Sequence, residues 1–402
     1  MINRLRLRFL TMLALSWLVL GIPSGAQTHD HSAMAATDGE FNPYVVSDNR
    51  GGFYLAYIQR KNGASNVMLQ HSLPGGALSA AVQVNNRPGD GAVRNENPPK
   101  IAVGTNNEVY VVWASERERW KGNIRFARSL NGGKTFEQAI DLNSDASQQP
   151  ISRAFQSIAV DAKGRIFVAW IDERNKTSKD RGAEIWMATS EDGGKSFSGN
   201  RKILSDVCEC CRTALGFDSS GRIYLSYRRV PPAGPMFRDI AVARSDDGGK
   251  AFNSTTVSRD RWELNGCPIA GATMTVTTDG RVHVVWFTQI GETPRLFIAS
   301  STDRGTSFSV PTVFDPTQKL AKHAHAVAIS ENQVLIAWDD LNGKSLVRWG
   351  VFDSTTKSMR ILGTRNAASY PIVAMSGRRI GVVALQPDQT ELFRSFQTAS
   401  IR

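Results

Sequence analysis

The stretch SEDGGKSF (residues 190–197) recurs along this chain, and its recurrence decides the fold class. Related octets are SLNGGKTF (129–136), SDDGGKAF (245–252) and STDRGTSF (301–308), so the copies start about 55 to 60 residues apart. The third residue can accept hydrogen bonds from backbone N–H groups, the following glycines tolerate positive φ, and the closing Phe returns to the core. The octet therefore predicts a structural turn between two strands of a repeat protein. The third positions are Asn131, Asp192, Asp247 and Asp303.

Around the octets the chain repeats a unit of two apolar strands joined by a turn that contains Gly, Asn or Asp. Runs of β-branched and aromatic residues of this length are typical of strands. Four strands per period, repeated radially, make a β-propeller, which removes most exposed sheet edges. The sequence therefore predicts an all-β propeller of four-stranded blades, seven by the number of strand pairs. These pairs cover residues 44–57, 101–113, 158–170, 214–227, 274–286, 327–338 and 372–385.

The first residues have the three-part pattern of a secretory signal peptide. Three arginines precede an apolar run, and residues 24–26 are small enough for a cleavage site. We therefore expect residues 1–26 to be removed as the protein is exported, either to the periplasm or as a secreted protein. No later segment is long and apolar enough to span a membrane. Residues 41–402 then form a single propeller domain, whose three-stranded last unit is expected to be completed by a strand near Phe41.

Residues 27–40 are small and polar, which predicts a flexible tail. The tail also contains His29, His31 and Met34, whose nitrogen and sulfur atoms suit copper. Accessory metal binding by the tail is therefore the alternative to a plain disordered segment.

The chain is basic, with a formal net charge of +11 that falls to about +8 without the leader. Such an excess favours acidic partners such as anionic glycans. Lysines and arginines are scattered and form no block, and no nucleic-acid-binding motif is present. A basic exported protein that does not bind nucleic acid is the simpler interpretation, and docking to a protein partner is a further alternative.

Cysteines and histidines gather at one end of the predicted channel. In a four-stranded blade the first strand lines the channel, so the octets lie on one face and the starts of the inner strands lie on the other. Three cysteines precede one inner strand, a fourth precedes the next, and two histidines start the strand after that. They are Cys208, Cys210, Cys211, Cys267, His323 and His325.

These residues support three interpretations. In an oxidising compartment, a disulfide from Cys267 to one of the other three cysteines would staple neighbouring blades. Thiolates with imidazoles also select soft metals, which makes copper or zinc the expected cofactor of a metal site. A reactive thiol is the third interpretation, since Arg212 beside Cys211 can lower a thiol pKa.

The octets resemble the Asp box, or BNR repeat, of the sialidase superfamily, where the box is a structural turn that also occurs in proteins without hydrolase activity. The resemblance implies six blades, whereas the strand pairs predict seven. It also implies a glycosidase site with three arginines around a substrate carboxylate, a tyrosine nucleophile paired with a glutamate, and an aspartate acid/base. The candidates in this chain are Arg153, Arg212, Arg365, Tyr370, Asp172 and Glu173.

The sequence departs from the family because it lacks the Arg-Ile-Pro segment that sialidases carry before their first Asp box. We therefore favour an exported binding protein with a Cys/His metal cluster at the channel mouth. The alternatives are an exo-α-sialidase or related glycan-acting or glycan-binding protein, and a structural or partner-docking propeller with disulfide-stapled blades.

Overall fold

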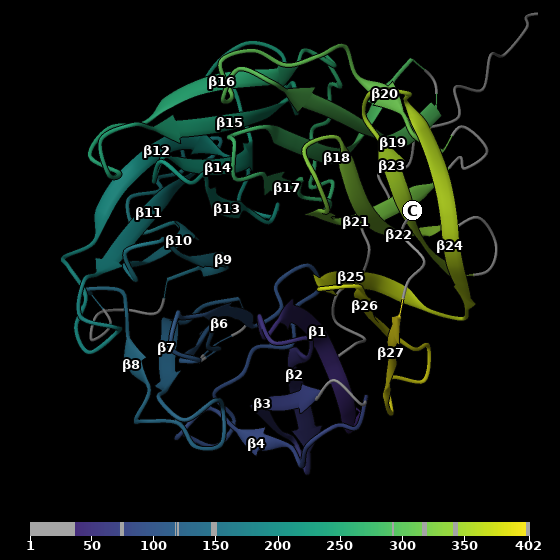
Figure 1. Ribbon diagram of the computed structural model, residues 1–402. Coiled ribbons are helices and arrows are strands. Elements are labelled where there is room, and N and C mark those ends of the chain that lie inside the picture. Colours follow the sequence, from purple (N-terminus) through teal and green to yellow (C-terminus); the bar gives the residue numbers. More distant parts are fainter. Residues whose placement is uncertain are drawn as a thin grey trace, which may run out of the picture. The chain divides into compact units, whose positions relative to one another are not determined.

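Short runs of β-branched and aromatic residues, separated by Gly, Asn and Asp turns, form strands throughout the described chain. The computed structural model describes residues 37–72, 76–116, 118, 120–145, 151–291, 293–315, 320–340 and 345–398. Within these ranges the strands make seven antiparallel sheets, six with four strands and one with three. Figure 1 shows the sheets as blades around a central axis, so the predicted seven-bladed propeller is confirmed and the six-bladed alternative is wrong.

Each blade is a meander in which successive strands pair in chain order. The first three blades contain β1 (Gly39–Ser47), β2 (Phe53–Lys61), β3 (Ala64–Ser72) and β4 (Val82–Gln83); β5 (Lys100–Val103), β6 (Val109–Ala114), β7 (Ile124–Ser129) and β8 (Ile140–Asp141); and β9 (Arg153–Val160), β10 (Ile166–Asp172), β11 (Ala183–Ser190) and β12 (Arg201–Val207).

The remaining four blades repeat this plan. They contain β13 (Ala214–Phe217), β14 (Ile223–Arg228), β15 (Ile240–Ser245) and β16 (Asn253–Ser258); β17 (Thr273–Val276), β18 (Val282–Ile290), β19 (Thr293–Ser301) and β20 (Thr312–Val313); β21 (Ala321–Ala328), β22 (Gln333–Asp340), β23 (Leu346–Asp353) and β24 (Ser358–Asn366); and β25 (Ser369–Ser376), β26 (Arg379–Leu385) and β27 (Leu392–Thr398). None of the described segments is a helix, so none is a helix long and apolar enough to cross a bilayer.

The ring closes differently from the prediction. The strand that contains Phe41, β1, is the innermost strand of the first blade and does not add a strand to the last one. Because the connection from β1 to β2 is short, β1 pairs antiparallel with β2, its neighbour in the chain. The first and last blades are instead joined by packing of β1 on β25 and β26, and by an ion pair of 2.8 Å between Glu40 and Arg394.

Large aromatic side chains fill the spaces between blades. Four tryptophans on the second strands are no more than 1% exposed, as fits residues that pack blade on blade. Each buries roughly 150–250 Å² of surface, which makes these positions major contributors to the core. They are Trp113, Trp170, Trp286 and Trp338.

The octets form the turns between the third and fourth strands of four blades, on the face opposite the starts of the inner strands. In the copy that follows β11, Asp192 accepts hydrogen bonds from the Ser190 hydroxyl at 2.8 Å and from the backbone N–H of Ser196 at 2.9 Å. The Gly194 N–H donates to Ser190 Oγ at 2.8 Å. Gly194 has φ of +80°, and a Cβ there would lie 2.7 Å from Phe126 Cζ of the preceding blade.

Replacing Ser190 by alanine is expected to lower the free energy of unfolding by about 1–3 kcal/mol, because the buried Gly194 N–H loses its acceptor. Urea denaturation measures the change, and Glu191→Ala, at an exposed position in the same turn, is the matched control. Equal midpoints for the two variants would show that the turn does not depend on this hydrogen bond.

Candidate functional site

Irregular backbone marks the starts of the inner strands. Four of these strands contain a β-bulge, and in each the bulge includes a residue with a positive φ of 46–55° that is not glycine. Bulges re-aim side chains, and they are frequent at barrel rims and beside active sites. The bulge residues are Asn42, Phe155, His323 and Tyr370.

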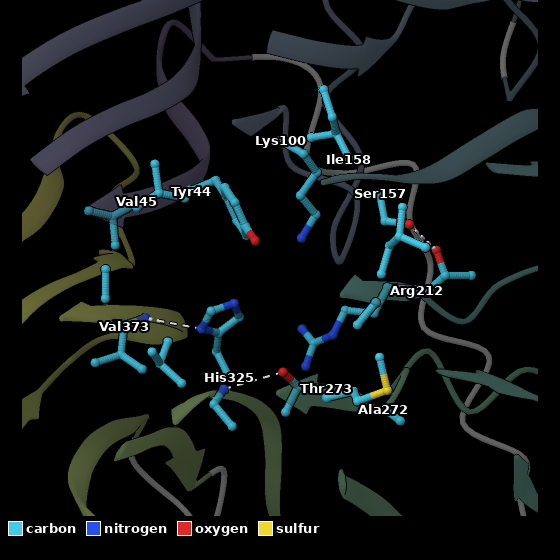
Figure 2. Close-up of a pocket in the computed structure, with 18 of the residues that line it drawn as sticks. Tyr44, Val45, Lys100, Ser157, Ile158, Arg212, Ala272, Thr273, His325 and Val373 are labelled. Atoms are coloured by element: carbon cyan, nitrogen blue, oxygen red, sulfur yellow. Dashed lines mark hydrogen bonds between the residues drawn. The ribbon is translucent and has the colours of Figure 1, made fainter. Parts of the chain in front are cut away.

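Just inside this rim, the channel holds a cavity of about 250 Å³. Every inner strand contributes to its wall, and Figure 2 shows polar side chains from several blades converging on it. Four of the inner strands place an equivalent residue on this wall. In each blade this residue pairs with the position just before the aromatic residue of the second strand. The four residues are Tyr44, Lys100, Ser157 and His325. These equivalent positions therefore carry four different groups: a phenol, an amine, a hydroxyl and an imidazole.

Lys100 is the most unusual of these four residues. It is 8% exposed, and its ammonium lies 3.9 Å from the centre of the Tyr44 ring. It forms no ion pair with a carboxylate of the described residues. Burial lowers the pKa of Lys100 to about 7, and the nearby positive charge of Arg212 acts in the same direction, against a smaller opposing effect of Glu96. The lysine thus changes charge near neutral pH.

Arg212 approaches the cavity from the loop before β13. Its guanidinium is paired with Glu96 at 2.9 Å and also donates to the carbonyl of Ala324 on β21. Both partners of the ion pair are buried, and Glu96 Oε2 has no hydrogen-bond partner among the described residues. Gly271 of the next blade is required here, since a Cβ at that position would lie 2.4 Å from Arg212 Cγ.

His325 completes the polar wall. Burial lowers its pKa well below the ordinary value, and the charges of Lys100 and Arg212 lower it further, so the imidazole is neutral at pH 7. Its Nδ1 accepts the Val373 N–H at 3.4 Å, which leaves the proton on Nε2. The ring meets Tyr44 edge-on, with centroids 5.7 Å apart. Two cationic groups and two neutral hydrogen-bonding groups therefore surround the cavity.

A second cluster lies at the bulges of β21 and β25. His323 Nδ1 contacts Asp339 at 2.8 Å, and its ring stacks on Tyr370 with centroids 4.0 Å apart. The Tyr370 hydroxyl accepts a hydrogen bond from Asn95 at 3.2 Å. Burial raises the pKa of Tyr370, and the negative charges of Glu96 and Asp339 raise it further. The phenol is therefore protonated at neutral pH.

The six predicted sialidase residues are spread over several places. Tyr370 and Arg212 line one small cavity of about 20 Å³ together with Glu96. Arg153 is buried in ion pairs with Asp145 at 2.6 Å and Asp172 at 3.1 Å. The structure also places Arg365 on the outermost strand of its blade, where it is exposed. Glu173 follows β10, and burial raises its pKa.

The four cysteines come together, as the strand register predicted. Cys210 and Cys267 form a disulfide between the loops that precede β13 and β17. Cys208 and Cys211 are buried thiols whose sulfur atoms lie 3.3 Å apart. The two predicted histidine ligands lie elsewhere, one against Asp339 and the other in the channel wall. His29, His31, Met34 and the leader lie outside the described residues.

The site residues predicted from the sequence did not include Lys100, Glu96 or Tyr44. A signal for them exists, because superposing the blades on the aromatic that ends each second strand puts Lys100 and Tyr44 in register with His325. Lys100 follows two prolines and was not recognised as a channel residue. Glu96 lies in an irregular segment, for which strand periodicity gives no guide.

No protein-family model and no curated protein sequence matches this chain. Solved structures do match. An ulvan lyase of polysaccharide lyase family PL25 has a TM-score of 0.60 at 11% identity, over 91% of this chain and 94% of that one. A protein of unknown function from Dyadobacter fermentans gives 0.53 at 17% identity, over 87% and 91%. The Hadza microbial sialidase Hz136 gives 0.52 at 13% identity, over 84% and 74%. At these identities the likeness shows the fold alone, and the chain has a sialidase-like propeller fold.

Proposed function

We propose that this protein is an exported propeller that binds the carboxylate of an acidic glycan at the mouth of its channel. The convergence of Lys100 and Arg212 on one cavity carries the proposal. Buried charges in proteins are normally paired. Among the described residues, Arg212 pairs with Glu96 and Lys100 pairs with no carboxylate, so a ligand with one negative group completes the charge balance.

The remaining wall groups suit a sugar. Tyr44 is half-buried, and its raised pKa of about 12 keeps the hydroxyl available as a donor at neutral pH. Figure 2 shows Tyr44 and His325 facing the same space as the two cations. Binding sites of this kind combine apolar walls with a few fixed polar groups that set orientation. A carboxylate held by charge-assisted bonds, with hydroxyl groups on the neutral donors, matches this arrangement.

The names of the structural neighbours support an acidic ligand. The PL25 ulvan lyase is described with a bound disaccharide of glucuronic acid and rhamnose 3-sulfate, and others are sialidases or trans-sialidases. Those proteins are only 11–13% identical to this chain, so their activities are a guide to ligand class and not to mechanism.

We favour binding over sialidase-type hydrolysis for a structural reason. Of the three candidate arginines, only Arg212 reaches the channel cavity, whereas Arg153 is held by two aspartates. Asp172, a candidate acid, accepts from both Arg153 and Arg174, and although burial raises its pKa these bonds bring it below the usual value. A general acid needs the opposite shift, which burial gives to Glu173, but Glu173 does not line the channel cavity. Export itself rests on the leader-like residues 1–26.

Isothermal titration calorimetry tests the proposal with two acidic probes, 3′-sialyllactose and an oligosaccharide of glucuronic acid, and with lactose as the neutral probe. We expect at least one acidic probe to bind, and to bind more tightly at pH 6 than at pH 8, because a Lys100 pKa of about 7 makes the side chain mostly protonated at pH 6 and mostly neutral at pH 8. Removing one charged contact typically costs 1.5–3 kcal/mol, or roughly ten- to hundredfold in affinity.

Two variants and one control sharpen the test. Lys100→Met removes the titrating cation. Gly271→Ala places a Cβ 2.4 Å from Arg212 Cγ and 2.5 Å from the Arg212 backbone N, so it displaces Arg212 without removing a charge. Both should weaken acidic-probe binding at least tenfold, whereas Lys195→Met, an exposed lysine on the opposite face, should not. Equal binding of lactose and the acidic probes, or unchanged affinity in Lys100→Met, contradicts the proposal.

A further inference from the structure

The cysteine cluster lies beside two buried arginines that the glycan proposal does not use. Arg238 is 6% exposed and donates to Cys208 Sγ at 3.6 Å, as well as to the carbonyls of Leu264 and Gly266. Arg228 is fully buried. It donates to backbone carbonyls that include Ala270, and its Nε has no hydrogen-bond partner among the described residues.

Neither guanidinium has an ion-pair partner within 4.0 Å among the described carboxylates. Asp239 lies farther away, and burial raises its pKa although the charge of Arg228 opposes the rise. Cys208 Sγ, 3.6 Å from an Arg238 nitrogen, lies closer to that guanidinium than any described carboxylate does. Because buried cations are costly without counter-charges, this environment favours cysteines in the thiolate form.

The pKa values of the two buried thiols shift in opposite directions. Burial alone would raise the pKa of Cys211. The hydrogen bond from Cys208, the charge of Arg228 and the Ala270 N–H outweigh burial and lower the pKa of Cys211, with Arg238 contributing to the shift. Cys208, as the donor in this pair, has a raised pKa.

The sulfur positions match a compact metal site. The ligand atoms of Cys208, Cys210 and Cys211 all lie within 4.8 Å of one another, and the sulfur of Cys208 is 3.5 Å from that of Cys210. Cys267 is bonded to Cys210 and so joins the same group. Tetrahedral zinc with bonds of about 2.3 Å places its sulfur ligands about 3.8 Å apart. Cys208, Cys210 and Cys211 therefore already lie near this spacing, whereas the sulfurs of Cys210 and Cys267 have to move apart after reduction.

We propose that the four cysteines form a tetrathiolate site for a thiophilic divalent ion, with zinc as the reference ion, once the Cys210–Cys267 bond is reduced. An external dithiol supplies two electrons and two protons, is itself oxidised to a disulfide, and leaves four cysteines. Zinc then binds all four sulfurs and displaces the protons that remain on them. The resulting complex has two net negative charges, which Arg228 and Arg238 face.

The exposure of the four cysteines agrees with reduction of the disulfide first and metal binding second. Cys267 is exposed and Cys210 is half-buried, whereas Cys208 and Cys211 are buried. The reductant and the ion therefore arrive from the disulfide side, and the buried pair closes the coordination sphere from within. The site also links the loops before β13 and β17, as the disulfide does, so reduction followed by metal binding exchanges one link between blades for another.

Anaerobic titration of the full mature chain, reduced with a phosphine, tests the site with Co²⁺ as a spectroscopic probe and Zn²⁺ as competitor. We expect one Co²⁺ per chain with a thiolate-to-cobalt charge-transfer band, and complete displacement by Zn²⁺. X-ray absorption of the zinc form should show only sulfur neighbours at about 2.3 Å. A nitrogen shell would point to histidine ligands and overturn the four-cysteine assignment.

Variants separate a built site from adventitious thiol binding. Cys208→Ser and Cys267→Ser should each abolish the tetrathiolate spectrum, and Arg238→Met should weaken affinity ten- to hundredfold, as loss of an outer-shell partner does. Arg229→Met, at an exposed arginine nearby, is the control. If a variant does not fold on expression, it is refolded from denaturant in the presence of zinc. The zinc that it retains is then measured in place of the cobalt titration. Absence of stoichiometric metal from the reduced wild-type protein, or equal affinities of the two arginine variants, refutes the proposal.

Discussion

Arg212→Gln is expected to lower the free energy of unfolding by about 3–5 kcal/mol and to abolish measurable binding of an acidic glycan. The loss of stability follows because Glu96 is left as a buried charge without its partner, 2.9 Å away in the native protein. The loss of binding follows because, in the part of the chain that the structure describes, Arg212 and Lys100 are the cationic residues that line the cavity. Thermal and urea denaturation measure the first effect, and calorimetry measures the second.

The double variant Glu96→Gln with Arg212→Gln is the decisive control for this prediction. Removing both charges of a buried pair costs much less than removing one, so the double variant should recover most of the lost stability. It should not recover glycan binding. An additive loss of stability in the double variant would mean that the two side chains do not interact as an ion pair.

Lys100→Met is expected to stabilise the ligand-free protein at pH 6 and to have a much smaller effect at pH 10. The pKa of Lys100 is about 7 in the folded chain and 10.5 for an ordinary lysine, so the unfolded chain binds more protons between these values. The stability of the wild type therefore rises with pH across this window, by an amount on the order of 4 kcal/mol from this one group. The variant lacks that rise.

Other groups also titrate between pH 7 and 10, so the informative quantity is the difference between wild type and variant at each pH. Lys195→Met provides the matched control, because its side chain is exposed and should show no such difference. A difference between wild type and Lys100→Met that does not change from pH 6 to pH 10 would show that Lys100 keeps an ordinary pKa in the folded protein.

The fold was predictable because local and global signals agree. The octet of residues 190–197 specifies its turn through side-chain acceptors and glycines, and the strand pairs that surround it repeat often enough to count the blades. Ring closure was not predictable in the same way. An N-terminal strand can pair with either neighbour, and the short connection from β1 to β2 gives the local partner the advantage.

The candidate site was predictable only in part. Strand order alone places Arg212, His325 and Tyr370 near one end of the channel, and it brings the cysteines together. It does not reveal that Lys100 is buried, since that depends on how neighbouring blades pack around the axis. Nor could it choose the partner of Cys267 among three nearby cysteines, because that choice depends on loop geometry.

The most direct test of the central claim is a crystal structure of the mature protein with an acidic oligosaccharide that binds in calorimetry. We expect electron density for the sugar in the channel mouth, with its carboxylate about 2.7–2.9 Å from Lys100 Nζ and from a nitrogen of Arg212. Density for the sugar on the octet face, or at the channel mouth with its carboxylate turned away from both cations, would contradict the account.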